Sequence, residues 1–186
     1  MTSTFPGKYL ARLSTLTLFA QLVMSFAFGQ MHPLAKESTI RFTIHNFGFR
    51  TGGSLAAPEG DIIFNPDDLA KSSFQVNVKT ENINTDNESR DNHLKEEDYF
   101  DVKKYPMIRF VSSAIRATGK KDGYEAKGTL TIKGTSREIS LPFTALKSGD
   151  GWAFTGSFTM NRRDYGVGGS STISNELTVD IKVIAR

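Results

Sequence analysis

The chain has no cysteine among its 186 residues. This absence excludes disulfides, thiolate metal sites, cysteine nucleophiles and lipidation of an N-terminal cysteine. The sequence also lacks a G-x-S-x-G, an H-E-x-x-H and a Walker loop. Its 20 acidic residues are scattered over polar positions and single out no carboxylate pair of the kind a glycosidase needs. We therefore expect a protein that is not an enzyme and that carries no cofactor.

The chain also lacks a concentrated charge of one sign. Its formal net charge is +3, and Lys8 and Arg12 supply two of these charges near the N-terminus. The remainder has 21 basic residues against 20 acidic ones. A nearly neutral body excludes a nucleic-acid-binding protein, which needs a basic face for the phosphate backbone.

The first 29 residues have the three-part layout of a secretory signal peptide. Lys8 and Arg12 precede an apolar stretch at 13–28, and small residues lie at its end, with Ala27 inside it and Gly29 directly after it. The stretch is interrupted by Ser, Thr and Gln, and it is shorter than the roughly 20 apolar residues of a membrane span. We expect cleavage after Ala27 or Gly29 and a periplasmic or secreted protein without a stable membrane span. An uncleaved anchor is the alternative.

From Glu37 onward, apolar and polar residues alternate with a period of two. This pattern is typical of half-buried antiparallel strands, and about eight such runs occur. Gly52-Gly53 is interpreted as a turn, and Asp122-Gly123 and Asp150-Gly151 are interpreted as hairpin turns in which glycine accepts a positive φ. Residues 30–186 are therefore predicted to form one all-β domain. The apolar face of the sheet must be buried against itself, either in a sandwich or in a closed barrel. The interior is either a packed core or a cavity.

One polar segment, residues 82–106, interrupts the alternation. Asp86 or Asn87 can cap a short helix in it, with Leu94 and Phe100 as its buried points. Pro106 ends the segment before the next strand. We interpret the segment as a long polar loop with a short helix that acts as a lid.

Five segments, taken in their order along the chain, form a recognisable series of motifs. They are Ser38–Gly48, Gly60–Leu69, Ile83–Phe110, Gly128–Phe143 and Met160–Gly168. The most specific part is Arg90-Asp91-x-His93-Leu94, followed by Tyr99-Phe100-Asp101 and Lys104-Tyr105-Pro106. Together they resemble the YceI-like family of lipocalin-like, polyisoprenoid-binding proteins of the bacterial periplasm. The resemblance implies an eight-stranded antiparallel barrel around an apolar cavity. It also implies a polyisoprenoid ligand or a related lipid, such as a quinone or polyprenyl phosphate, and is compatible with a homodimer.

The inward-facing apolar residues are the candidate lipid-binding residues, and their alternative role is a filled core with function on the outer surface. Tyr165 stands where the family usually has Phe, and its hydroxyl is a candidate contact for a ligand head group. The candidates are Ile40, Phe42, Ile44, Phe64, Val76, Val78, Phe110, Leu130, Ile132, Phe143, Phe154, Phe158, Tyr165, Val179 and Ile181.

Two polar clusters have structural and functional interpretations. Arg162, Arg163 and Asp164 suit a turn with a salt bridge, or an Arg that meets a ligand head group. The segment from Arg90 to His93 suits hydrogen bonds and ion pairs that fasten the long loop to the barrel. The competing metal site, built on His93 with Asp91, Asp98 and Asp101, matches no zinc or calcium spacing, so we expect no metal.

Overall fold

The computed structural model describes Met1, residues 29–169 and residues 172–186. Most of the predicted signal peptide, residues 2–28, lies outside the described residues, so that assignment stays a prediction. Within the described ranges, no helix has both the length and the apolar character needed to cross a membrane.

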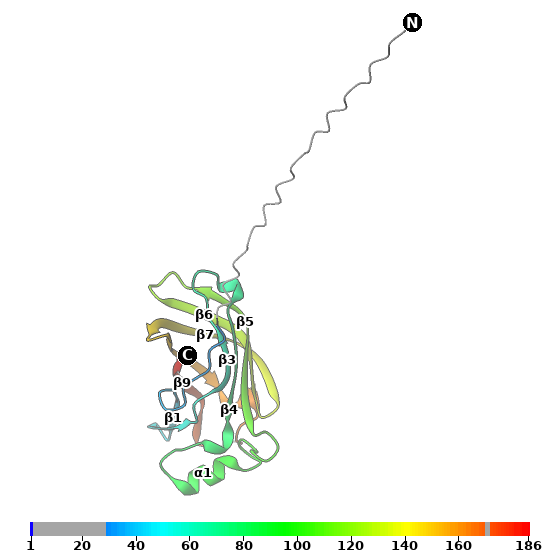
Figure 1. Cartoon of the computed structure of the whole chain (residues 1–186). Coiled ribbons are helices and arrows are strands. Elements are labelled where there is room, and N and C mark those ends of the chain that lie inside the picture. The colour runs from blue at the N-terminus through cyan, green and yellow to red at the C-terminus, as the bar shows by residue number, and fades with distance from the viewer. Residues whose placement is uncertain (2–28, 170–171) are drawn as a thin grey trace.

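The fold is a single antiparallel sheet of nine strands, wrapped into an open barrel (Figure 1). The order across the sheet is β2-β1-β9-β8-β7-β6-β5-β4-β3. A tight turn joins β1 to β2, residues 64–72 join β3 to β4, and β1 also pairs with β9. The predicted all-β antiparallel architecture is confirmed. The strands are β1 Thr39–Asn46, β2 Phe49–Leu55, β3 Glu59–Ile63, β4 Ser73–Lys79, β5 Met107–Ala117, β6 Gly123–Ile132, β7 Thr135–Ser148, β8 Gly151–Asn161 and β9 Ile173–Ala185.

The two edge strands, β2 and β3, flank a seam. Isolated bridges tie this seam to other segments. Ser54 of β2 exchanges two backbone hydrogen bonds with Asn84, at 2.7 and 2.9 Å. Ile62 of β3 exchanges two with Met31, at 2.8 and 2.9 Å. These bridges satisfy part of the edge that an open sheet would otherwise expose.

The strand count corrects the expectation of eight. The additional strand is β2, whose centre is the Gly52-Gly53 pair interpreted above as a turn. A Cβ atom at Gly52 would lie 2.1 Å from the carbonyl oxygen of Phe42, and one at Gly53 would lie 2.4 Å from that of Asn84. Glycine is therefore required here because neighbouring backbone approaches closely, and not because the chain turns.

The hairpin turns also differ in detail from the prediction. The positive φ angles fall at Asp122 (54°) and Gly149 (60°), whereas Gly123 and Gly151 begin strands β6 and β8. Both predicted hairpins exist, but the left-handed residue comes one or two positions earlier. Asp tolerates this conformation better than most residues, which permits the shift at Asp122.

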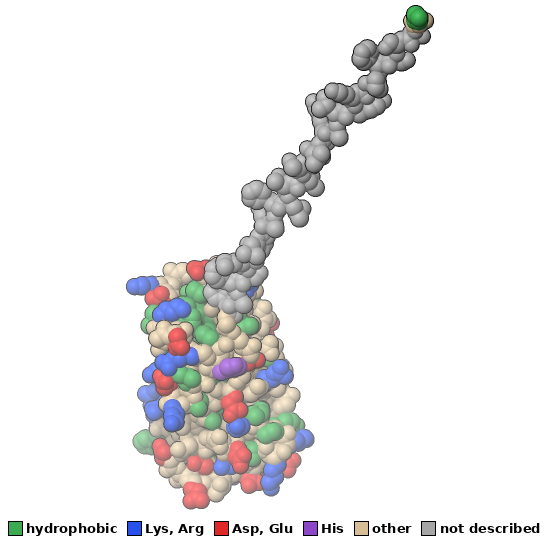
Figure 2. Space-filling view, viewed as in Figure 1, with side chains coloured by type: hydrophobic (Ala, Val, Ile, Leu, Met, Phe, Trp, Pro, Cys, Tyr) green, Lys and Arg blue, Asp and Glu red, His purple; other side chains and the backbone are tan. Residues whose placement is uncertain are grey.

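One helix, α1 (Glu88–Lys95), lies at the lower end of the barrel in Figure 1. Three short 3-10 turns also occur within the described residues, at Leu69–Lys71, Thr80–Asn82 and Arg162–Tyr165. Figure 2 shows acidic and basic side chains interspersed over the visible face of the barrel, with acidic side chains at the end where α1 lies. The sheet thus has a polar outer face, and the site lies on its inner face.

Candidate functional site

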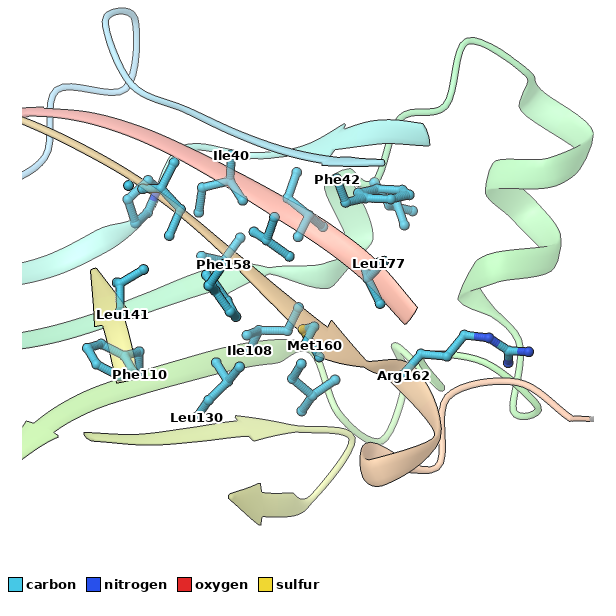
Figure 3. A pocket seen from close by; sticks show the side chains of 18 of the residues that line it. Ile40, Phe42, Ile108, Phe110, Leu130, Leu141, Phe158, Met160, Arg162 and Leu177 are labelled. Carbon is cyan, nitrogen blue, oxygen red and sulfur yellow. The ribbon is translucent and has the colours of Figure 1, made fainter. Parts of the chain in front are cut away.

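The inner face of the sheet encloses a cavity of about 240 Å³ to which all nine strands contribute side chains. Figure 3 shows Ile108, Phe158 and Met160, from β5 and β8, pointing into this common space. The cavity exceeds the roughly 150 Å³ of an apolar protein cavity that stays dry and binds benzene. Of the fifteen predicted residues, those that line it are Ile40, Phe42, Ile44, Val76, Val78, Phe110, Leu130, Ile132, Phe143, Phe154, Phe158, Val179 and Ile181.

The alternation of each strand explains why these side chains meet. Successive residues of a strand point to opposite faces, so every second residue of the curved sheet faces inward. Val76, Phe158 and Val179 are only half-buried although they face the interior. Their remaining surface faces the cavity, which the surrounding side chains leave unfilled.

An aromatic cluster closes one end of the cavity. Phe74, Phe143 and Phe154 line the wall, and the ring of Phe64 lies behind them with centroid separations of 6.5, 6.1 and 5.4 Å. Phe64 is 2% exposed and is absent from the lining. Its predicted role as a wall residue is therefore corrected, because it packs as a floor beneath the wall.

The outer side of this floor is also aromatic. Phe64 packs edge-on against Tyr124 at 5.1 Å and against Trp152 at 5.0 Å. Edge-to-face pairs at these separations are favourable beyond the area they bury. The cluster accounts for several of the fourteen Phe residues and makes this end of the cavity a closed one.

The opposite end is covered by α1 and the segment that follows it. Leu94, Tyr99 and Phe100 from this segment join the cavity lining. Asn87 caps the helix by accepting a hydrogen bond from the N–H of Arg90 at 2.9 Å. Asn87 is thus the capping residue, and Leu94 and Phe100 are half-buried and face the cavity. These contacts hold the polar segment over this end of the barrel.

Hydrogen bonds to Thr85 fasten the helix. Asp91 accepts hydrogen bonds from the N–H and the hydroxyl of Thr85, and Arg90 donates to the Thr85 hydroxyl and carbonyl at 2.8 and 2.6 Å. Thr85 is buried and follows Asn84, which is bridged to β2. Arg90 and Asp91 therefore fasten the long loop to the barrel, and they do so through Thr85.

His93 has a different contact from the one expected. Its ring packs against Tyr99 with centroids 4.8 Å apart. Across the described residues, no group of three or more His, Asp and Glu side chains is placed to hold a metal ion. Thr85 and Arg90 are thus the polar groups that α1 and its approach contribute to the lining.

Arg162 also lines this end, and in Figure 3 its side chain extends from the end of β8 toward α1. The buried guanidinium donates to the carbonyls of Val167 at 2.8 Å and Ser174 at 3.0 Å. Burial, with a smaller effect of Arg163, lowers the pKa of Arg162 below its ordinary range. Arg remains charged in proteins, so it places a partly desolvated positive charge beside the cavity.

Tyr165 does not lie where the sequence interpretation places it. Its side chain is 3% exposed but does not line the cavity. Burial, followed by the charge of Asp164, raises the pKa of its phenol above the ordinary value of 10.0. The proposed contact between this hydroxyl and a head group is therefore not supported by the geometry.

The cavity also includes residues that were not named as candidates. Ile108, Ile139, Leu141 and Leu177 belong to strands and follow the same alternation, so that pattern was sufficient to find them. The residues from the 83–100 segment have no such periodic signal. Only the return of this segment across the barrel end places them in the lining.

The chain is similar in sequence and in fold to several known proteins. Residues 33–185 match the model of the YceI-like domain. A UPF0312 protein of Pseudomonas savastanoi pv. phaseolicola is 32% identical over 153 residues, covering 78% of this chain and 79% of that protein. BcnA of Burkholderia cenocepacia superposes with a TM-score of 0.78 at 24% identity, covering 83% of this chain and 99% of that one. A polyisoprenoid binding domain from Saccharophagus degradans superposes with a TM-score of 0.69 at 12% identity, covering 84% and 97%.

Proposed function

Since this chain belongs to the YceI-like domain family, we propose that it is a non-enzymatic binding protein that holds a polyisoprenoid or a similar amphiphilic lipid in its barrel. The observation that carries the proposal is the apolar cavity of about 240 Å³, closed by aromatic rings at one end. The fold shared with a polyisoprenoid binding domain from Saccharophagus degradans supports the same ligand class. Quinones and polyprenyl phosphates are candidate ligands.

The walls can supply the affinity without a polar anchor. Each buried methylene contributes about 0.8 kcal/mol, so a five-carbon isoprene unit contributes a few kcal/mol when fully buried. A bilayer offers the same chain a comparable apolar environment. Selectivity therefore comes from the shape of the cavity and from the groups at its end.

Those groups give the ligand a direction. The floor end presents Phe74, Phe143 and Phe154, whereas the α1 end presents the polar side chains of Arg90 and Arg162. A carboxylate, phosphate or quinone oxygen is more favourable near the guanidinium groups than among the rings. We place the tail toward the floor and the head group toward α1.

The segment over this end acts as the lid of the cavity in our proposal. Leu94 and Phe100 give it apolar contact with the interior, and the hydrogen bonds at Thr85 fasten it. Most of its other side chains are polar and exposed, so little burial opposes its opening. Ligand exchange should then depend on these few attachments.

The alternative is a filled barrel that acts through its outer surface. The unfilled interior and the half-buried Val76, Phe158 and Val179 around it favour the lipid-binding function. We also propose that the protein is exported, on the strength of the N-terminal signal pattern. The intact mass of the protein isolated from its native cells checks this, since cleavage after Ala27 or Gly29 sets the N-terminus.

The decisive experiment is native mass spectrometry of the protein purified from its own cells, followed by analysis of the extracted lipid. Val179→Trp fills the cavity from β9, and Thr159→Trp adds the same side chain to the exposed outer face of β8. We expect bound lipid in the wild type and Thr159→Trp, and its loss in Val179→Trp. A folded wild type that carries no lipid and binds none when polyprenol is added contradicts the proposal.

A further inference from the structure

The tip of the β1–β2 hairpin exposes two aromatic side chains. Phe47 is 71% exposed and Phe49 is 79% exposed. After Met1, they are the most exposed large hydrophobic side chains among the described residues. Aromatic rings at a protruding turn contribute little to the core, and exposed apolar groups of this size indicate an interaction site.

The backbone at this tip is also unfavourable for the residue it carries. Phe47 has φ of 49° and Gly48 has φ of 81°, so both central residues of the turn are left-handed. Gly, Asn and Asp fill such positions readily, whereas a bulky aromatic residue is strained there. Folding thus places the Phe47 ring in solvent at a conformational cost, without gaining burial in return.

One of the two exposed rings, that of Phe49, continues a row of residues that leads into the cavity. Across the hairpin, Phe49 is paired with Asn46, Ile44 with Thr51, and Phe42 with Gly53. Paired residues of antiparallel strands share a face, and every second residue returns to that face. Ile44, Thr51 and Phe42 line the cavity, so Phe49 lies on the same face just beyond the rim.

The outer face of the same hairpin is basic. The segment Thr39–Leu55 contains Arg41, His45 and Arg50 and no acidic residue. His45 and Arg50 are exposed and lie directly opposite each other near the tip. The segment 88–101, which covers the neighbouring end of the barrel, carries six acidic residues against only Arg90 and Lys95. The charge pattern would therefore turn the hairpin rather than this segment toward a surface of phosphate groups.

The small size of the patch argues against a second copy of the chain as its partner. Two aromatic rings bury roughly 300–500 Å². A stable dimer buries about 800 Å² on each partner. A narrow, convex tip with two rings and flanking basic groups instead suits the interfacial region of a lipid bilayer, where aromatic residues lie between acyl chains and head groups.

We propose that the β1–β2 hairpin tip docks the protein on a lipid bilayer by inserting Phe47 and Phe49. These rings lie next to the row of inward-facing hairpin residues that leads into the cavity. The docking itself depends only on the hairpin. Its use, the transfer of a lipid tail between the bilayer and the barrel, rests on the function proposed above.

The test is co-sedimentation of the isolated protein with vesicles of phosphatidylethanolamine and phosphatidylglycerol. The double variant Phe47→Asn, Phe49→Thr keeps residues suited to the turn and the strand while removing both rings. Leu146→Ser is the matched control, because Leu146 is an exposed apolar residue on β7 that does not line the cavity. All proteins must have the same N-terminus, established by intact mass.

We expect the double variant to bind vesicles at least about tenfold more weakly than the wild type, and Leu146→Ser to bind as the wild type does. Equal binding by the double variant overturns the proposal. The proposal is also overturned if light scattering shows that the two rings drive self-association while vesicle binding does not depend on them.

The same set of proteins separates docking from lipid storage. Val179→Trp should still sediment with vesicles although its cavity is filled, and this result supports docking whether or not the wild type carries a lipid. The opposite result is a wild type from which bound lipid can be extracted, but which sediments with vesicles no better than the double variant. That result overturns docking and leaves the proposed function intact.

Discussion

Phe64 tests the shape of the cavity most directly, because it closes the floor without lining the wall. Replacing it with Ala removes a ring that is 2% exposed and that contacts five other aromatic rings. Substitutions of this kind cost about 3–5 kcal/mol. Domains are commonly stable by about 5–15 kcal/mol, so we expect a folded but less stable protein.

The cost also indicates how much space the substitution opens. A cavity contribution of about 2 kcal/mol corresponds to about 80 Å³ at 24 cal/mol per Å³. This volume would deepen the existing cavity of about 240 Å³ toward Trp152 and Tyr124. If half of an added isoprene unit is buried there, the longer chain gains about 2 kcal/mol, or more than tenfold in affinity.

The assay compares geraniol, farnesol and geranylgeraniol as competitors of a fluorescent fatty acid in the wild type and in Phe64→Ala. We expect the preference to shift by more than tenfold toward the longer alcohol in the variant. Ile184→Ala is the control for lost stability, since Ile184 is buried but lies outside the cavity lining and the aromatic cluster. An unchanged order of affinities in Phe64→Ala would refute Phe64 as the floor of the ligand site.

Three further outcomes follow from the fold. Gly52→Ala should lower the free energy of unfolding by about 2 kcal/mol or more in urea titrations, while Gly169→Ala, with open space around its Cβ position, should change it by less than about 0.5 kcal/mol. The folded protein favours neutral Tyr165, and this contribution to stability is present below pH 10 and declines as the pH rises from 10.0 through the higher pKa of the folded state. Tyr165→Phe should therefore lose less stability than the wild type at alkaline pH, and parallel pH profiles of the free energy of unfolding contradict this. Thr85→Val, which cannot bond to Asp91 or Arg90 through a hydroxyl, should release a bound fluorescent fatty acid faster in stopped-flow measurements, and an unchanged rate would remove the lid role.

The turn chemistry shows where local inference failed. A Gly-Gly pair between two apolar runs is typical of a turn, yet Gly52 and Gly53 occupy the middle of β2. Their requirement arises from the carbonyls of Phe42 and Asn84, the latter more than thirty residues away along the chain. No local pattern contains that contact, because it exists only after the loop before α1 crosses to the edge of the sheet.

Phe64 and Tyr165 show the same limit for the site. Phe64 directly follows β3, and Tyr165 ends the 3-10 turn after β8. Neither the alternation at Phe64 nor the family resemblance at Tyr165 predicts which neighbours bury the ring. The structure buries both outside the cavity lining. Arg90 shows the opposite case. It is polar and exposed, yet it reaches the cavity lining because α1 lies across the barrel end.

The sequence alone determined the all-β architecture, the inward rows of side chains and the capped helix, because period-two alternation and capping depend on residues a few positions apart. Only the tertiary structure decided that these rows surround a space, which end of it is aromatic and which is polar, and that two phenylalanines remain outside. Those properties depend on the curvature of the sheet and on where distant segments return to it, and neither is encoded within a single strand.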